Sequence, residues 1–87
     1  MSTNLYWRPI LPEPDGECLS KALKFAISRK LWDTDGSCGS GEQVLTEAHI
    51  SFLEGMMVVG SVEIVRDCQT LIDAINKYGA ISLWHQG

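Results

Sequence analysis

The sequence predicts an α+β fold in which three amphipathic helices pack on one face of a small two- or three-stranded sheet. Three observations predict it. Segments rich in strand-forming residues lie at both ends of the 87-residue chain, three segments between them show the apolar period of helices, and the links are short. A chain of this length closes one core, so residues 1–87 are predicted to form a single domain with the order β-α-β-α-α-β.

The first strand is expected over residues 4–11, NLYWRPIL, which are rich in strand-forming residues. Pro9 has no backbone N–H to donate, so this strand is expected at an edge of the sheet. Two prolines then break the chain, and Asp15 is a candidate N-cap for the helix that follows.

That helix is expected over residues 17–31. Lys21 and Lys24 lie on its polar side, and Arg29 and Lys30 near its end complement the negative pole of the helix dipole. The helix is therefore predicted to present a basic face to solvent. Its apolar side is predicted to consist of Cys18, Leu19, Ala22, Leu23, Phe25 and Ala26.

Residues 33–42, DTDGSCGSGE, are expected to form a flexible glycine-rich loop. A calcium loop counted from Asp33 would need glycine at Cys38 and glutamate at Val44, so its register fails. A phosphate-binding loop would follow a strand and end in Gly-Lys-Ser/Thr, which this segment does not. We interpret it as a solvated connection leading into a very short strand over 43–45.

The second helix is expected over residues 47–59, with Thr46 as its N-cap. Ile50, Leu53 and Met57 form one apolar stripe, and a second apolar side is formed by Phe52, Met56 and Val59. A helix that is apolar around much of its circumference is either enclosed in the core or offered to a partner.

Gly60 is expected to end that helix, and Ser61 to begin a third over residues 62–78. Its apolar stripe is the cleanest in the chain, and Gly79 is expected to end it. Residues 80–86 then alternate apolar and polar side chains, the period of a half-buried strand, with Trp84 on the polar side.

The sequence contains no recognisable catalytic or metal-binding motif. The three cysteines and two histidines have neither the CxxC nor the HxxxH spacing of a metal site. Cys18 and Cys68 are predicted to be small core residues, and neither His49 nor His85 can be paired with Cys38 as a catalytic base. We therefore predict no catalytic residue, no metal and no cofactor.

Charge and hydropathy limit the partners. The net charge of −4 argues against a general nucleic-acid binder, because phosphate recognition needs clustered Lys and Arg. No apolar run approaches the roughly 20 residues that cross a bilayer, and the first residues do not resemble a secretion signal. An odd number of widely spaced cysteines favours reduced thiols, so a cytoplasmic location is expected.

Two motifs, YWRP at residues 6–9 and LIDAINKYGAISLW at residues 71–84, resemble small bacteriophage-encoded proteins of unknown function. The resemblance covers most of the chain outside the glycine-rich loop. It implies a non-structural phage or prophage accessory protein in the cytoplasm of a bacterial host.

We interpret the chain as a non-enzymatic accessory protein that binds a host or phage protein, with inhibition as one outcome, or that forms a homo-oligomer through the second helix. The predicted contact residues are Phe52, Met56, Val59 and Trp84. The alternative is nucleic-acid or acidic-partner contact through the first helix, at Lys21, Lys24, Arg29 and Lys30.

Overall fold

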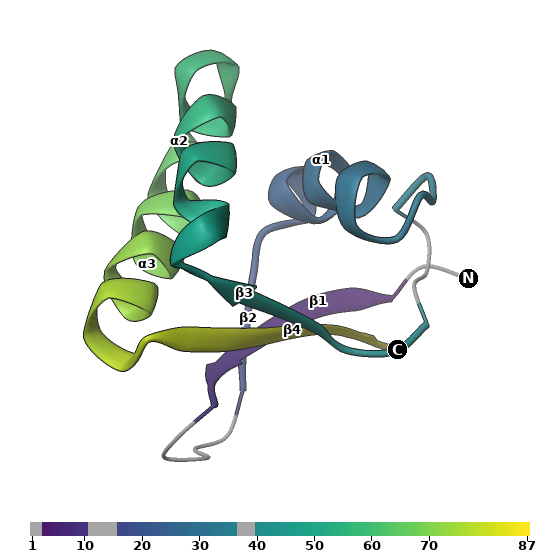
Figure 1. Ribbon diagram of the computed structural model, residues 1–87. Helices are drawn as coiled ribbons and strands as arrows, with labels where there is room; N and C mark the ends of the chain where they lie inside the picture. The colour runs from purple at the N-terminus through teal and green to yellow at the C-terminus, as the bar shows by residue number, and fades with distance from the viewer. Residues whose placement is uncertain (1–2, 11–15, 37–39) are drawn as a thin grey trace.

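The computed structural model describes residues 3–10, 16–36 and 40–87, and shows the predicted α+β architecture (Figure 1). Three helices lie on one face of an antiparallel sheet whose strand order is β2-β1-β4-β3. Along the chain the elements are β1 (Asn4–Pro9), β2 (Glu17–Cys18), α1 (Lys21–Leu31), β3 (Gln43–Thr46), the 3-10 turn η1 (Glu47–His49), α2 (Ile50–Val59), α3 (Val62–Tyr78) and β4 (Ala80–Gln86).

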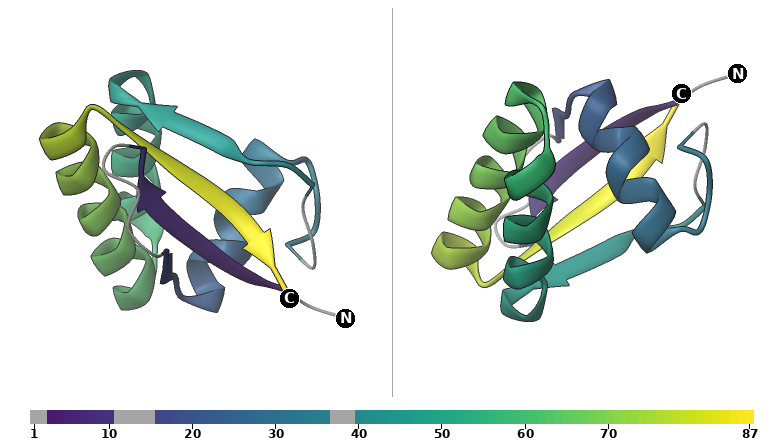
Figure 2. Two further views of the ribbon diagram at one scale, coloured as in Figure 1. Left: turned by 90° about the horizontal axis from the view of Figure 1, so that it is seen from below. Right: turned by 90° about the horizontal axis from the view of Figure 1, so that it is seen from above.

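The two ends of the chain pair with each other, as expected, but the prediction that the first strand lies at an edge of the sheet was wrong, because β2 pairs with the other side of β1. β1 runs antiparallel to β4 along its whole length, from Asn4 opposite Gln86 to Pro9 opposite Ile81. β3 extends the sheet on the other side of β4. Figure 2 shows that the helices cover one face and leave the opposite face of the sheet without a helix; we call this the open face.

The strand count was one too low, because residues 17–18 were predicted to begin a helix and instead form β2. They pair with Tyr6 and Trp7 of β1. The helix begins only after Ser20, whose hydroxyl oxygen accepts a hydrogen bond of 3.2 Å from the backbone N–H of Leu23. Asp15, the predicted N-cap, lies outside the described residues.

The orientation of α1 also differs from the prediction. Leu23 and Ile27 face the sheet, and the residues that follow each of them, Lys24 and Ser28, are fully buried as well. Phe25, predicted to be in the core, is 44% exposed. The ammonium of Lys24 tolerates burial because it donates a hydrogen bond of 2.5 Å to the carbonyl oxygen of Thr3, at the start of the chain.

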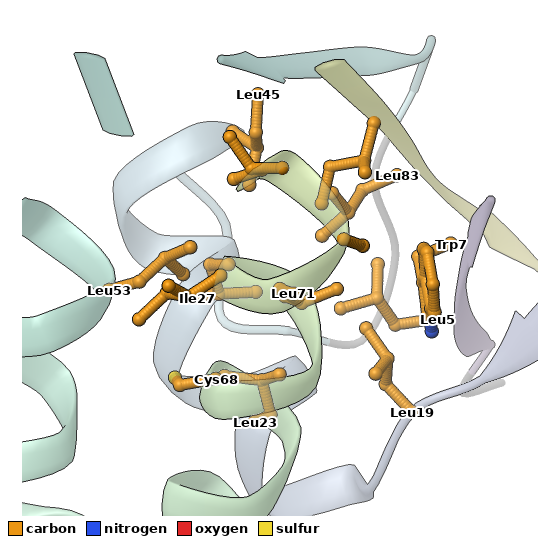
Figure 3. Close-up of a cluster of buried hydrophobic side chains, with 14 residues drawn as sticks. Leu5, Trp7, Leu19, Leu23, Ile27, Leu45, Leu53, Cys68, Leu71 and Leu83 are labelled. Carbon is orange, nitrogen blue, oxygen red and sulfur yellow. The ribbon is translucent and has the colours of Figure 1, made fainter. Parts of the chain in front are cut away.

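The core lies between the helices and the sheet (Figure 3). Leu71 of α3 and Leu83 of β4 are fully buried there, whereas α2 contributes a single fully buried residue, Leu53. Most of the apolar surface of α2 is therefore not used by the core. Phe52, Met56 and Met57 pack against the core only in part.

α2 and α3 form a helical hairpin, and Gly60 stands between them. Its backbone is extended, with φ −84°, so the glycine is not there to supply a left-handed conformation. A Cβ at this position would lie 2.5 Å from the Ile64 side chain and 2.7 Å from the carbonyl oxygen of Met56. Only glycine lets the two helices approach this closely.

Candidate functional site

Three strongly exposed valines mark the end of the α2–α3 hairpin that lies farthest from the sheet (Figure 1). Val58 is 83% exposed, Val59 88% and Val62 80%. We call these three residues the valine tip. The side chains of the valine tip remain largely in water although α1 lies close to this end of the hairpin.

An apolar hollow of about 220 Å³ lies beside the valine tip, between α1 and the hairpin. It exceeds the roughly 150 Å³ of an apolar cavity that holds a benzene-sized ligand, so it can accept an aliphatic side chain. We call it the hairpin groove. Its lining residues are Ala26 and Lys30 of α1, Met56 and Val59 of α2, Gly60, and Ile64 of α3.

Small residues form part of the lining of the groove. Ala26 contributes only a methyl group from α1. Gly60 contributes backbone, and the space beside it is filled by Ile64 and by the carbonyl oxygen of Met56. The sequence pattern marked both helices as amphipathic, but the gap between them depends on where α1 docks.

The predicted partner-contact residues are not all in one place. Met56 and Val59 line the hairpin groove together. Phe52 is half-buried one turn earlier on α2, where it packs against the core. Trp84 is on the opposite side of the molecule, on the open face of the sheet, so the prediction that it joins the other three in one site was wrong.

Trp84 is held by its own neighbours on the open face. Its ring stacks on Tyr6 with 6.0 Å between the centroids and 19° between the planes, and the guanidinium of Arg8 lies 5.2 Å from its centroid. Its indole N–H donates to the side-chain oxygen of Gln86 at 3.0 Å. A Cβ on Gly16 would lie 2.5 Å from the ring, so glycine is required beside it. These contacts give Trp84 a structural role as the cover of the sheet.

The predicted basic face of α1 is broken. Lys21, Arg29 and Lys30 are exposed as expected, but Lys24 is fully buried and cannot contact a phosphate. Lys30 borders the apolar hairpin groove instead of joining a basic surface. The prediction of a four-residue basic surface on α1 is corrected accordingly.

A buried polar cluster joins α1 to β4. The hydroxyl of Ser28 and Nε2 of His85 share a hydrogen bond of 3.0 Å, and the edge of Trp32 meets the imidazole with 4.4 Å between ring centroids. Burial, and then the nearby charge of Lys24, lower the pKa of His85, so folding favours the neutral imidazole. Ser28 is fully buried and His85 is half-buried, and their hydrogen bond fastens the end of β4 to α1.

The thiols and histidines form no site within the ranges that the structure describes. Cys68 is buried, and burial followed by the charge of Asp67 raises its pKa to about 11, which withholds the thiolate. Cys18 was predicted in the core, but it is exposed because it lies on the short edge strand β2. Nδ1 of His49 accepts a hydrogen bond of 3.0 Å from the backbone N–H of Thr46. Cys38 lies outside the described residues.

Metal-ligand geometry is equally lacking in the described ranges, where no group of three or more His, Cys, Asp or Glu side chains comes together. The helices in these ranges include none that is long and apolar enough to cross a membrane.

Comparisons with protein-family models, with curated proteins and with solved structures gave no match for this chain. The resemblance to bacteriophage proteins therefore stays a prediction.

Proposed function

We propose that this chain is a non-enzymatic binding protein that holds another protein through the valine tip and the hairpin groove. The observation that carries the proposal is the valine tip itself: three branched apolar side chains, each at least 80% exposed, one of which, Val59, also lines an apolar hollow. Contiguous exposed apolar surface next to a groove is typical of protein-interaction sites.

The energetic reason is the hydrophobic effect. Full burial of one valine side chain that was exposed contributes about 1.5–3 kcal/mol. The valine tip contributes nothing of this kind to the folded monomer, because its side chains remain in water. A partner that covers the tip and places an apolar side chain in the groove gains this free energy on binding, less the cost of association.

A lipid surface is a poorer match for the same tip. Helices that lie on membranes combine their apolar side with several Lys and Arg residues. Here the charged residues within four positions of the tip are Glu54, Glu63 and Arg66, so acids outnumber bases there. These acids would be repelled by anionic lipids, which favours a protein as the partner.

Substitution of Val59 by aspartate is expected to abolish partner binding while leaving the fold intact, because Val59 is almost fully exposed in the monomer. The measurement compares the proteins retained from a bacterial lysate by immobilised wild-type chain and by Val59→Asp, quantified by mass spectrometry. Circular dichroism checks the fold of each variant.

Val44 supplies the matched control, since it is another exposed valine and lies in β3. Val44→Asp is expected to retain the same proteins as the wild type. Equal retention of lysate proteins by the wild type and Val59→Asp, in a wild type that also does not self-associate, would refute the proposed function, as would equal losses in Val44→Asp and Val59→Asp.

A further inference from the structure

We infer that the partner bound at this surface is a second copy of the same chain, related to the first by a two-fold axis close to Val59. This inference rests on the proposed function and names its partner. Three features of the surface carry it: a projection and a hollow that lie side by side, a residue shared by both, and opposite charges on the two helices that flank them.

The shape of the surface is complementary to itself. The valine tip projects and the hairpin groove recedes, and Val59 belongs to both. In a two-fold contact each copy presents the same surface, so a projection on one copy must meet a hollow on the other. Because the two lie next to each other, a rotation about an axis at Val59 places the tip of each copy over the groove of its partner.

The hollow suits a valine or isoleucine better than a long polar side chain. Its walls are the methyl and methylene groups of Ala26, Met56 and Ile64, and Lys30 is the one charged residue among its lining. The chain itself supplies branched apolar side chains of that size at Val58 and Val62, both largely unburied. No foreign ligand chemistry is needed to explain the groove.

Opposite charges lie on the two sides of the groove. Lys30 lies on the α1 side of the groove, whereas Glu63 is exposed on the first turn of α3, one residue before the groove-lining Ile64. Hydrogen bonds from the backbone of Glu63 itself and from Ser61 lower the pKa of Glu63, so it is ionised at neutral pH. A two-fold rotation exchanges the two sides, which brings Lys30 of each copy toward Glu63 of the other.

The open face of the sheet does not offer an equally defined contact. Tyr6, Arg8 and Trp84 stack on one another there, and Ser82 beneath them is 1% exposed. The Trp84 indole N–H is also satisfied there, by the side chain of Gln86. This surface is therefore covered by its own side chains, while the hairpin end is not.

The test is a charge exchange read by sedimentation equilibrium of the purified chain over roughly 1 μM to 1 mM, a range that covers weak association. The wild type is expected to show a monomer–dimer equilibrium with a Kd of roughly 1–100 μM, since the contact is small. Lys30→Glu and Glu63→Lys are each expected to weaken dimerisation by about tenfold, because the two-fold axis repeats the lost attraction. The double variant is expected to recover most of the wild-type affinity.

Two further variants serve as controls, one expected to disrupt the dimer and one expected to leave it unchanged. Val59→Asp is expected to weaken dimerisation by at least roughly 100-fold, because it brings two unpaired carboxylates into the contact. The matched charge exchange Lys21→Glu with Asp73→Lys changes exposed residues of the same two helices that do not line the groove, and is expected to leave the equilibrium unchanged.

The outcomes separate this inference from the proposed function. If the chain is a monomer at every concentration but Val59→Asp still loses lysate proteins, the partner is not a second copy. The proposed function is unaffected by that result. A chain that stays monomeric, and whose retained lysate proteins do not change on Val59→Asp, overturns both the second copy and the proposed function. A dimer that ignores Val59→Asp, or one that the double charge exchange fails to recover, overturns the two-fold arrangement.

Discussion

Replacement of Lys24 by glutamate is expected to lower the free energy of unfolding by about 3–5 kcal/mol, the cost of leaving a buried charge without a partner. The Lys24 ammonium is fully buried and donates to the carbonyl oxygen of Thr3. A carboxylate in its place would put two hydrogen-bond acceptors against each other, with no donor between them. The measurement is urea denaturation followed by circular dichroism.

Lys21, one turn earlier on the same helix, provides the matched control because it is exposed. Lys21→Glu is expected to change the free energy of unfolding by no more than about 0.5 kcal/mol. Lys24→Met, which keeps the length of the side chain and removes its charge, is expected to stay within about 1 kcal/mol of the wild type. Equal stabilities of Lys21→Glu and Lys24→Glu would show that Lys24 is not buried.

Replacement of Asp67 by alanine is expected to lower the free energy of unfolding by about 1.5–3 kcal/mol, the contribution of a hydrogen bond to a charged group. Asp67 lies on α3 and is 8% exposed. Its carboxylate accepts a hydrogen bond of 2.8 Å from the backbone N–H of Ser20, at the N-terminal end of α1. The first turn of α1 has no acid of its own, so Asp67 supplies the negative charge that a helix N-terminus favours.

Asp73 is the control on the same helix, since it is exposed and accepts a hydrogen bond from the Gln69 side chain within α3. Asp73→Ala is expected to cost no more than about 0.5 kcal/mol in the same denaturation experiment. Asp67→Asn keeps an acceptor oxygen and is expected to lose less than Asp67→Ala. If Asp67→Ala were as stable as Asp73→Ala, the tether between α3 and α1 would not exist in solution.

The elements that the sequence pattern located well are those whose ends have their own chemical signals. α3 begins after Ser61, whose hydroxyl accepts from the backbone N–H of Ile64, and ends at Gly79, where φ is +87°. Most of its apolar stripe is buried against the core, at Cys68, Leu71, Ile72 and Ile75, but Asp67, expected on the polar face, is buried as well. β4 lies at the expected place, but its burial does not alternate, because Ser82 is buried together with Ile81 and Leu83.

The errors in α1 have a different origin. Ser20 and not Asp15 begins the helix, because Asp67 satisfies the Ser20 N–H from 47 residues away, a contact that no local pattern reveals. Lys24 is buried because Thr3 offers an acceptor at the far end of β1. A lysine on a helix is normally solvated, so its burial depends on tertiary contacts that periodicity cannot show.

The candidate site was foreseen only in part. The surplus of apolar residues on α2 pointed to Met56 and Val59, and both line the groove. Ala26 and Lys30 were missed as groove residues because their position depends on how α1 docks. The exposure of the valine tip had a local signal in the sequence. Branched apolar residues lie on both sides of a glycine at 58–62, and they cannot all be buried in a tight helical turn.

The central claim is that the end of the α2–α3 hairpin is a protein-binding surface, occupied by a second copy of the chain. Its most direct test is to record backbone amide chemical shifts of the isotope-labelled chain at increasing protein concentration. Shifts confined to residues 26–30 and 56–64 are the predicted result. Concentration-dependent shifts at Tyr6, Arg8 and Trp84, with none at the hairpin end, would contradict it.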